Sequence, residues 1–187
     1  MKYTTISLVI FALFGALIFS IELTACPILT ALSGVPASCG FVGFAVEPLL
    51  AILAALITRK PFAFAITLFI LSVLQLTNPI ILGIPNILVL LPLTISGLIV
   101  EPLVRKYTLK SAILAGGIYL TISAIFVSLI ITMMWFPGAE LIAKVPTELV
   151  VAVFAVSFIM GAVGGLIGYK IYKKVESKPF VKMMQSK

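Results

Sequence analysis

Residues 109–136 read LKSAILAGGIYLTISAIFVSLIITMMWF, a run whose single charged residue, Lys110, stands at its start. A bilayer-spanning α-helix needs about 20 predominantly apolar residues, and this run is long enough. Its apolar residues are continuous, whereas the strands of a membrane β-barrel alternate apolar and polar residues. The stretch therefore predicts a transmembrane helix.

The rest of the chain repeats this pattern. Of its 187 residues, 62% are hydrophobic and 10% are charged, whereas a soluble domain is about 45–50% apolar and about 25% charged. We expect an all-α, polytopic membrane helical bundle of about six transmembrane helices, formed by a single domain over 1–172 and followed by a basic cytoplasmic tail over 173–187. The predicted spans are 4–23, 40–58, 62–78, 84–104, 109–136 and 147–172.

Lysine and arginine concentrate on the cytoplasmic side of membrane proteins. With six spans, 12 of the 13 basic residues fall on one side and only Lys144 falls on the other. We therefore expect a multi-pass protein of the cell (plasma) membrane with both termini in the cytoplasm. The same bias explains the net charge of +7 as a topology signal with a possible contact to lipid headgroups, without nucleic acid as a partner.

The N-terminal segment has a second interpretation. Lys2, the apolar run 6–21 and the sequence Leu-Thr-Ala-Cys ending at Cys26 resemble a lipoprotein signal peptide. Its removal would leave five spans with the N-terminus outside, and the charge bias fits that arrangement equally well.

The chain contains no histidine, and all six of its acidic residues are glutamates. This composition excludes a Ser-His-Asp triad, aspartyl dyads and histidine-ligated haem, zinc or copper sites. We therefore expect no enzyme, no metal and no cofactor.

Glu47 is the strongest single candidate for a functional residue. It lies near the middle of the second predicted span and precedes Pro48. A charged residue at the bilayer centre costs about 2.5–3.5 kcal/mol on insertion scales, so it normally faces the protein interior or a wet cavity. A protonated, purely structural glutamate is the alternative. Glu101 instead stands four residues before Arg105, which suits an intrahelical ion pair.

Other candidates lie toward the predicted outer side. Gln75, Asn78 and Asn86 bracket the second outer loop, and Glu148 begins the last span from the same side. Our predicted ligand-binding set is Glu47, Asn78, Asn86 and Glu148. Cys26 and Cys39 are the only cysteines, and both fall in the first outer loop, where a disulfide is permitted.

Small residues at helical spacing mark close helix contacts in membranes. Ala12 and Ala16 form such a row in the first span, continued by Ser20. Two glycine pairs form others in the last span, Gly161 with Gly165 and Gly164 with Gly168.

These features resemble the substrate-binding S components of energy-coupling factor (ECF) vitamin transporters. Ala12-Leu-Phe-Gly-Ala16 is similar to the alanine-x-x-x-alanine motif of their first helix, 39–45 to their glycine-bearing second helix, and 91–106 to their fourth helix with its basic end. The resemblance implies a six-helix protein that captures a small vitamin-like molecule from outside, beneath a lid formed by the first loop. It implies docking through Ala12 and Ala16 on a transmembrane coupling subunit, driven by two cytoplasmic ATPases.

Three other functions are compatible with the sequence. The chain could be a non-catalytic accessory or assembly subunit of a larger membrane complex. It could be a channel or secondary transporter in which Glu47 binds a proton or ion. It could also be an intramembrane enzyme with Glu47 as a general base, although the sequence puts no nucleophile, metal ligand or second acid beside it.

Overall fold

The computed structural model of the chain describes residues 3–33, 39–77, 80–81, 84–135 and 147–186. These residues are almost entirely helical, as the sequence predicted, and each predicted span corresponds to one helix. The only strands among them, β1 (Ile80–Ile81) and β2 (Ile84–Pro85), form a short antiparallel pair. The helices are α1 (Thr5–Ser33), α2 (Cys39–Thr58), α3 (Ala63–Gln75), α4 (Asn86–Val104), α5 (Leu109–Trp135), α6 (Thr147–Val175) and α7 (Pro179–Ser186).

Helix α1 is longer than the sequence predicted. The predicted span ended at residue 23, but the helix continues through Pro27 to Ser33 and is 29 residues long. Proline is tolerated inside a membrane helix because neighbouring groups satisfy the freed backbone carbonyl. Glu22 is therefore not at the end of a helix but inside one.

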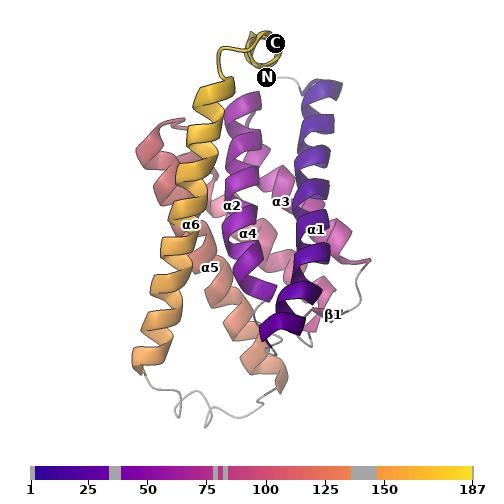
Figure 1. The fold of residues 1–187 in the computed structure, drawn as a ribbon, viewed down its shortest axis with the longest axis vertical. Coiled ribbons are helices and arrows are strands. Elements are labelled where there is room, and N and C mark those ends of the chain that lie inside the picture. Colours follow the sequence, from indigo (N-terminus) through magenta and orange to yellow (C-terminus); the bar gives the residue numbers. More distant parts are fainter. Residues whose placement is uncertain (1–2, 34–38, 78–79, 82–83, 136–146, 187) are drawn as a thin grey trace.

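The six longer helices pack as a closed ring. Neighbours around it contact one another in the order α1, α2, α6, α5, α4, α3 and back to α1 (Figure 1). Helix α2 lies deepest, because it also contacts α3, α4 and α5. Its residues 50–58 are all buried, as expected for a helix that is apolar on every side.

The outer surface of the ring is apolar. In the described part of the chain, three helices are long and apolar enough to cross a membrane, over Thr5–Ser33, Leu109–Ile130 and Val150–Val175. Large apolar side chains are exposed along them, including Leu13 and Leu17 on α1 and Val151 and Ile159 on α6. Because water disfavours such a surface, the fold indicates a membrane protein.

Helix α6 packs against its neighbours through two glycine rows, as the sequence predicted. A Cβ atom on Gly161 or Gly165 would overlap the backbone of α5, at Gly116 and Ala112. A Cβ on Gly164 would lie 2.7 Å from the Ala45 carbonyl oxygen of α2. The glycines thus let α6 approach both helices closely.

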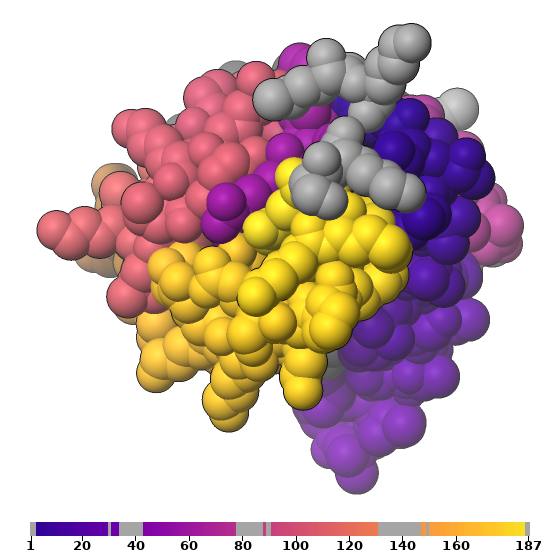
Figure 2. Space-filling model, turned by 90° about the horizontal axis from the view of Figure 1, so that it is seen from above, coloured from indigo at the N-terminus to yellow at the C-terminus, as the bar shows by residue number. Residues whose placement is uncertain are grey.

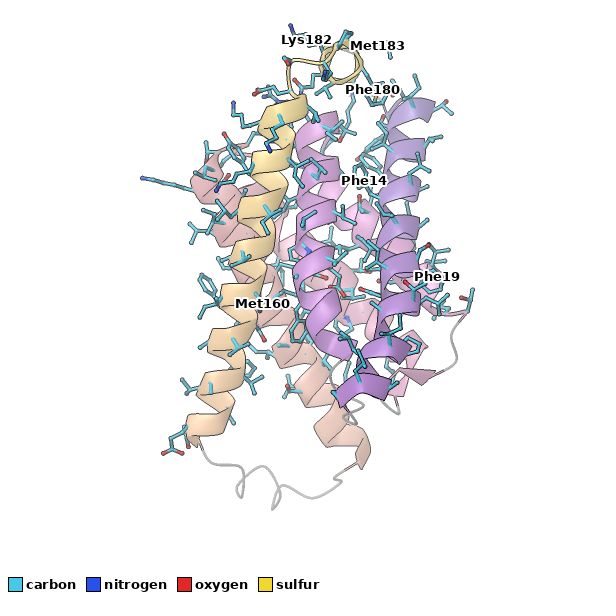
Figure 3. The ribbon with its side chains drawn as sticks, viewed as in Figure 1. Phe14, Phe19, Met160, Phe180, Lys182 and Met183 are labelled. Atoms are coloured by element: carbon cyan, nitrogen blue, oxygen red, sulfur yellow. The ribbon has the colours of Figure 1, made fainter. Side chains whose placement is uncertain are left out.

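The start of α1 and the end of α6 lie at the same end of the bundle, where α7 covers the end of α2 (Figures 1 and 2). Val181 and Met184 of α7 are buried, and Gln185 donates a hydrogen bond to the Leu56 carbonyl, 3.2 Å away. Phe180, Lys182 and Met183 stand at this end in Figure 3. The predicted basic tail therefore contains a helix packed on the bundle.

Candidate functional site

Four helices contribute polar side chains to one buried cluster inside the ring. Glu22 comes from α1, Glu47 from α2, Gln75 from the last residue of α3 and Tyr119 from α5. All four side chains are buried. We call these four residues the carboxyl cluster.

Glu47 and Tyr119 form the shortest hydrogen bond in the cluster. The Tyr119 hydroxyl donates to Oε2 of Glu47 over 2.6 Å, a length typical of a bond to a charged acceptor. The Tyr119 ring is fully buried and stands edge-on to Phe64 of α3, with 5.3 Å between ring centroids. The ring is thus fixed by apolar packing, and its hydroxyl is held at the carboxyl group.

Glu22 is held on the other side of the cluster. The Gln75 amide donates to Oε2 of Glu22 over 2.9 Å. The carboxyl group of Glu22 also lies within hydrogen-bonding reach of that of Glu47. Gly43, one turn before Glu47, leaves room for this approach, because a Cβ there would lie 3.1 Å from Oε1 of each glutamate.

Glu101 has a separate, structural role. Its Oε2 accepts a hydrogen bond of 3.2 Å from the Ala65 backbone N–H in the first turn of α3, where a negative charge is favourable. Its Oε1 lies 3.6 Å from Nε of Arg105, which confirms the predicted intrahelical ion pair. The guanidinium of Arg105 also stacks on Phe62, 4.7 Å from the ring centroid. Glu101 therefore joins the end of α4 to the start of α3.

A second polar network joins the helix ends next to α7. Arg59, after α2, donates to the Tyr172 hydroxyl over 3.0 Å and lies 3.7 Å from the Glu176 carboxylate. Lys173 donates to the same carboxylate over 2.7 Å. Hydrogen bonds from Lys173 and from Tyr172 hold the pKa of Glu176 below its usual range, so this partly exposed carboxylate remains ionised at neutral pH.

The predicted ligand-binding residues do not all meet. Glu47 is in the carboxyl cluster, whereas Glu148 is exposed in the first turn of α6. Gly164, the α6 residue beside Pro48, lies 16 residues further along, or about 24 Å at the helical rise. Asn86 begins α4, but its side chain is outside the described structure, and Asn78 lies outside the described residues.

The first predicted outer loop is partly helical. Cys26 lies inside α1 and is disulfide-bonded. The only other cysteine of the sequence, Cys39, is the first residue of α2, and its side chain is not among those described.

The Ala12 and Ala16 row lies on the outer side of α1. Ala12 is exposed, Ala16 is partly exposed and Ser20 is exposed. The opposite side of the same helix carries the internal packing, because a Cβ on Gly15 would lie 3.1 Å from the Thr67 carbonyl oxygen of α3. The alanine row is therefore not used by the bundle itself.

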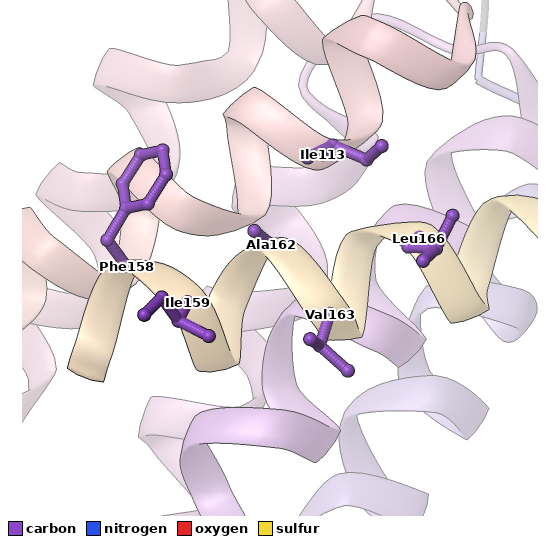
Figure 4. A pocket seen from close by; sticks show the side chains of 6 residues that line it. All are labelled: Ile113, Phe158, Ile159, Ala162, Val163 and Leu166. Carbon is purple, nitrogen blue, oxygen red and sulfur yellow. The ribbon is translucent and has the colours of Figure 1, made fainter. Parts of the chain in front are cut away.

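An apolar pocket of about 210 Å³ opens on the outside, between α5 and α6 (Figure 4). Its walls contain no charged side chain, so in a membrane it suits an acyl chain better than a polar solute. It is lined by Ile113, Phe158, Ile159, Ala162, Val163 and Leu166.

Sequence reasoning singled out Glu47 but did not identify its partners. The sequence puts Glu22 near the end of a span and Gln75 at the edge of a loop, and its apolar pattern does not distinguish Tyr119. One signal was available for Tyr119, because a tyrosine deep in an apolar helix needs a partner for its hydroxyl. The chain matches no protein-family model, no curated protein and no solved structure.

Proposed function

We propose that this chain is the membrane-embedded substrate-binding subunit of an importer of the ECF type. It would capture a small vitamin-like molecule on the outer side and dock on a transmembrane coupling subunit that two cytoplasmic ATPases drive. The proposal includes six membrane passes with both termini in the cytoplasm.

The observation that carries the proposal is the exposed alanine row on α1. Exposed positions around it bear large apolar side chains, including Val9, Leu13 and Leu17. Ala12 and Ala16 leave a shallow strip between them. Small residues let another helix backbone approach closely, and in a membrane such packing drives helix association. A second subunit would therefore find its closest approach to α1 along this row.

The charge distribution supports the orientation. The described basic residues lie in or beside the turns and helix ends near α7, and a cytoplasmic position is the usual one for such a cluster. They are Arg59, Lys60, Arg105, Lys106, Lys110, Lys170, Lys173, Lys174, Lys178 and Lys182.

The proposal is tested by purifying the full chain from its native membranes in mild detergent and identifying the proteins that accompany it. We expect two small ATPases and one larger helical subunit. Ala12→Trp and Ala16→Trp should each lose these partners, because the indole would hold the second helix away. Ala155→Trp is the matched control, because Ala155 is also an exposed alanine but lies on α6.

Two outcomes would contradict the proposal. Retention of the three partners by both α1 variants would show that docking does not use this row. A stable set of unrelated subunits with the unmodified chain would instead identify an accessory subunit of another membrane complex.

A further inference from the structure

The carboxyl cluster contains two acidic groups and no basic one among the described residues that form it. Its two neutral members donate hydrogen bonds to the acids, Gln75 to Glu22 and Tyr119 to Glu47. Both bonds end on an Oε2 atom. The Oε1 atom of each glutamate lies beside Gly43, 3.1 Å from where a Cβ atom would stand.

The hydrogen bonding of Glu22 is incomplete. Glu22 is only 9% exposed, and among the described residues no donor reaches its buried Oε1. A buried carboxylate oxygen without a donor is costly. The group that faces it is the carboxyl of Glu47, which accepts hydrogen bonds but cannot donate one while it is ionised. Two ionised carboxylates in contact also repel each other strongly where water is excluded.

A single proton would supply the missing hydrogen-bond donor and would also remove the repulsion between the two carboxylates. Bound to either carboxyl group, it turns the contact between the two carboxyl groups into an O–H···O hydrogen bond and leaves one negative charge on the pair. Tyr119 and Gln75 then stabilise that charge through the Oε2 atoms. We propose that Glu22 and Glu47 form a proton-binding site in which the two carboxyl groups share one exchangeable proton at neutral pH. This inference does not rest on the proposed transport function.

The site joins separate parts of the fold. Glu22 and Glu47 lie on α1 and α2, and their donors lie on α3 and α5. The other described acids do not belong to it. Glu101 pairs with Arg105, Glu176 pairs with Lys173, and Glu148 lies at the exposed start of α6. Loss of the proton would place two charges in contact between α1 and α2. Protonation is therefore coupled to how closely these helices pack.

Infrared spectroscopy of the full chain in lipid vesicles tests the proposal, because a protonated carboxylic acid has its own carbonyl stretch. The acid-unfolded protein calibrates the band, since its six glutamates and its C-terminus are then all protonated. At neutral pH the unmodified chain should show a band equal to one carboxylic acid. Glu22→Gln and Glu47→Gln should each abolish it, because the new amide donates where the shared proton did and leaves the remaining carboxylate ionised.

The controls are Glu148→Gln and Glu101→Gln, which should each retain the band. Glutamine resembles a protonated glutamate in shape and hydrogen bonding, so the single variants preserve the packing. A band equal to two acids, halved in each single variant, would mean two independent neutral glutamates and would overturn the proposal. Absence of the band from the unmodified chain would also overturn the proposal. So would a thermal unfolding temperature that depends on sodium, since a metal ion would then occupy the site.

Discussion

At the scale of single residues, the hydrogen bond between Tyr119 and Glu47 gives the sharpest test of the buried cluster. Tyr119→Phe removes one oxygen atom and keeps the ring against Phe64. Removing the donor from a buried carboxyl group costs about 1–3 kcal/mol. We expect a lower thermal unfolding temperature in detergent, measured beside Tyr169→Phe, which removes the hydroxyl of a tyrosine that is only partly buried near the end of α6. Equal stability of the two variants would mean that the bond contributes nothing.

The sequence predicted Glu47 as a candidate site residue but not the residues that contact it. Glu47 was predictable because an acid in an apolar run needs an explanation. Its partner Tyr119 is 72 residues away in the chain, and nothing local relates the two positions. The sequence puts Glu22 near the end of a span because Pro27 follows it closely, although in the fold both residues lie inside α1. Which acids meet is decided by the packing of α1 on α2.

At the scale of elements, the contact between α5 and α6 depends on glycine. Gly161→Leu should separate these helices, because any side chain there would overlap the Gly116 backbone. Overpacking typically costs about 1–3 kcal/mol and occasionally more. We expect the upper part of that range or beyond, since the obstacle is rigid backbone. The measurement is thermal unfolding of the purified variant, together with its yield from membranes.

A neighbouring position supplies the matched control. Ala162 is the next residue of α6 and lines the open apolar pocket (Figure 4). Ala162→Leu adds a large side chain to the same helix, but into open space, so the variant should unfold within about 0.5 kcal/mol of the unmodified chain, as is usual for surface changes. If both variants were equally unstable, the glycine contact would not be the cause.

Most helix boundaries were predictable, because charges and prolines interrupt the apolar runs where turns are needed. The turns after α2 and α4 contain Arg59 and Arg105, and α5 begins at the predicted residue 109. The extension of α1 and the existence of α7 were not predictable from this pattern. Helix α7 is short and lies in a basic segment, and it is stabilised by contacts with α2 that local sequence does not specify.

At the scale of the whole molecule, the fold separates two kinds of polar chemistry. The described basic residues belong to helix ends and turns at the end of the bundle that carries α7, and the carboxyl cluster lies further inside the ring. Glu47 precedes Thr58, the last residue of α2, by 11 positions, or about 16 Å along the helix. Glu101 is only three residues from the end of α4. Glu47 and Glu101 therefore lie at different depths in the bundle.

This separation leads to a prediction about orientation. If the basic end faces the cytoplasm, green fluorescent protein fused after Lys106 or after Lys187 should fluoresce, and alkaline phosphatase at the same points should be inactive. Fusions after Gly138 should behave in the opposite way, because the sequence between α5 and α6 would lie outside. A tag before Met1 tests the first helix separately. The N-terminus lies in the cytoplasm if the purified chain retains the tag and if protease added to intact cells does not remove it. Loss of the tag together with a fluorescent C-terminal fusion would instead support the arrangement with a cleaved signal peptide. An active phosphatase after Lys187 would contradict both arrangements, since each of them places the ten described basic residues in the cytoplasm.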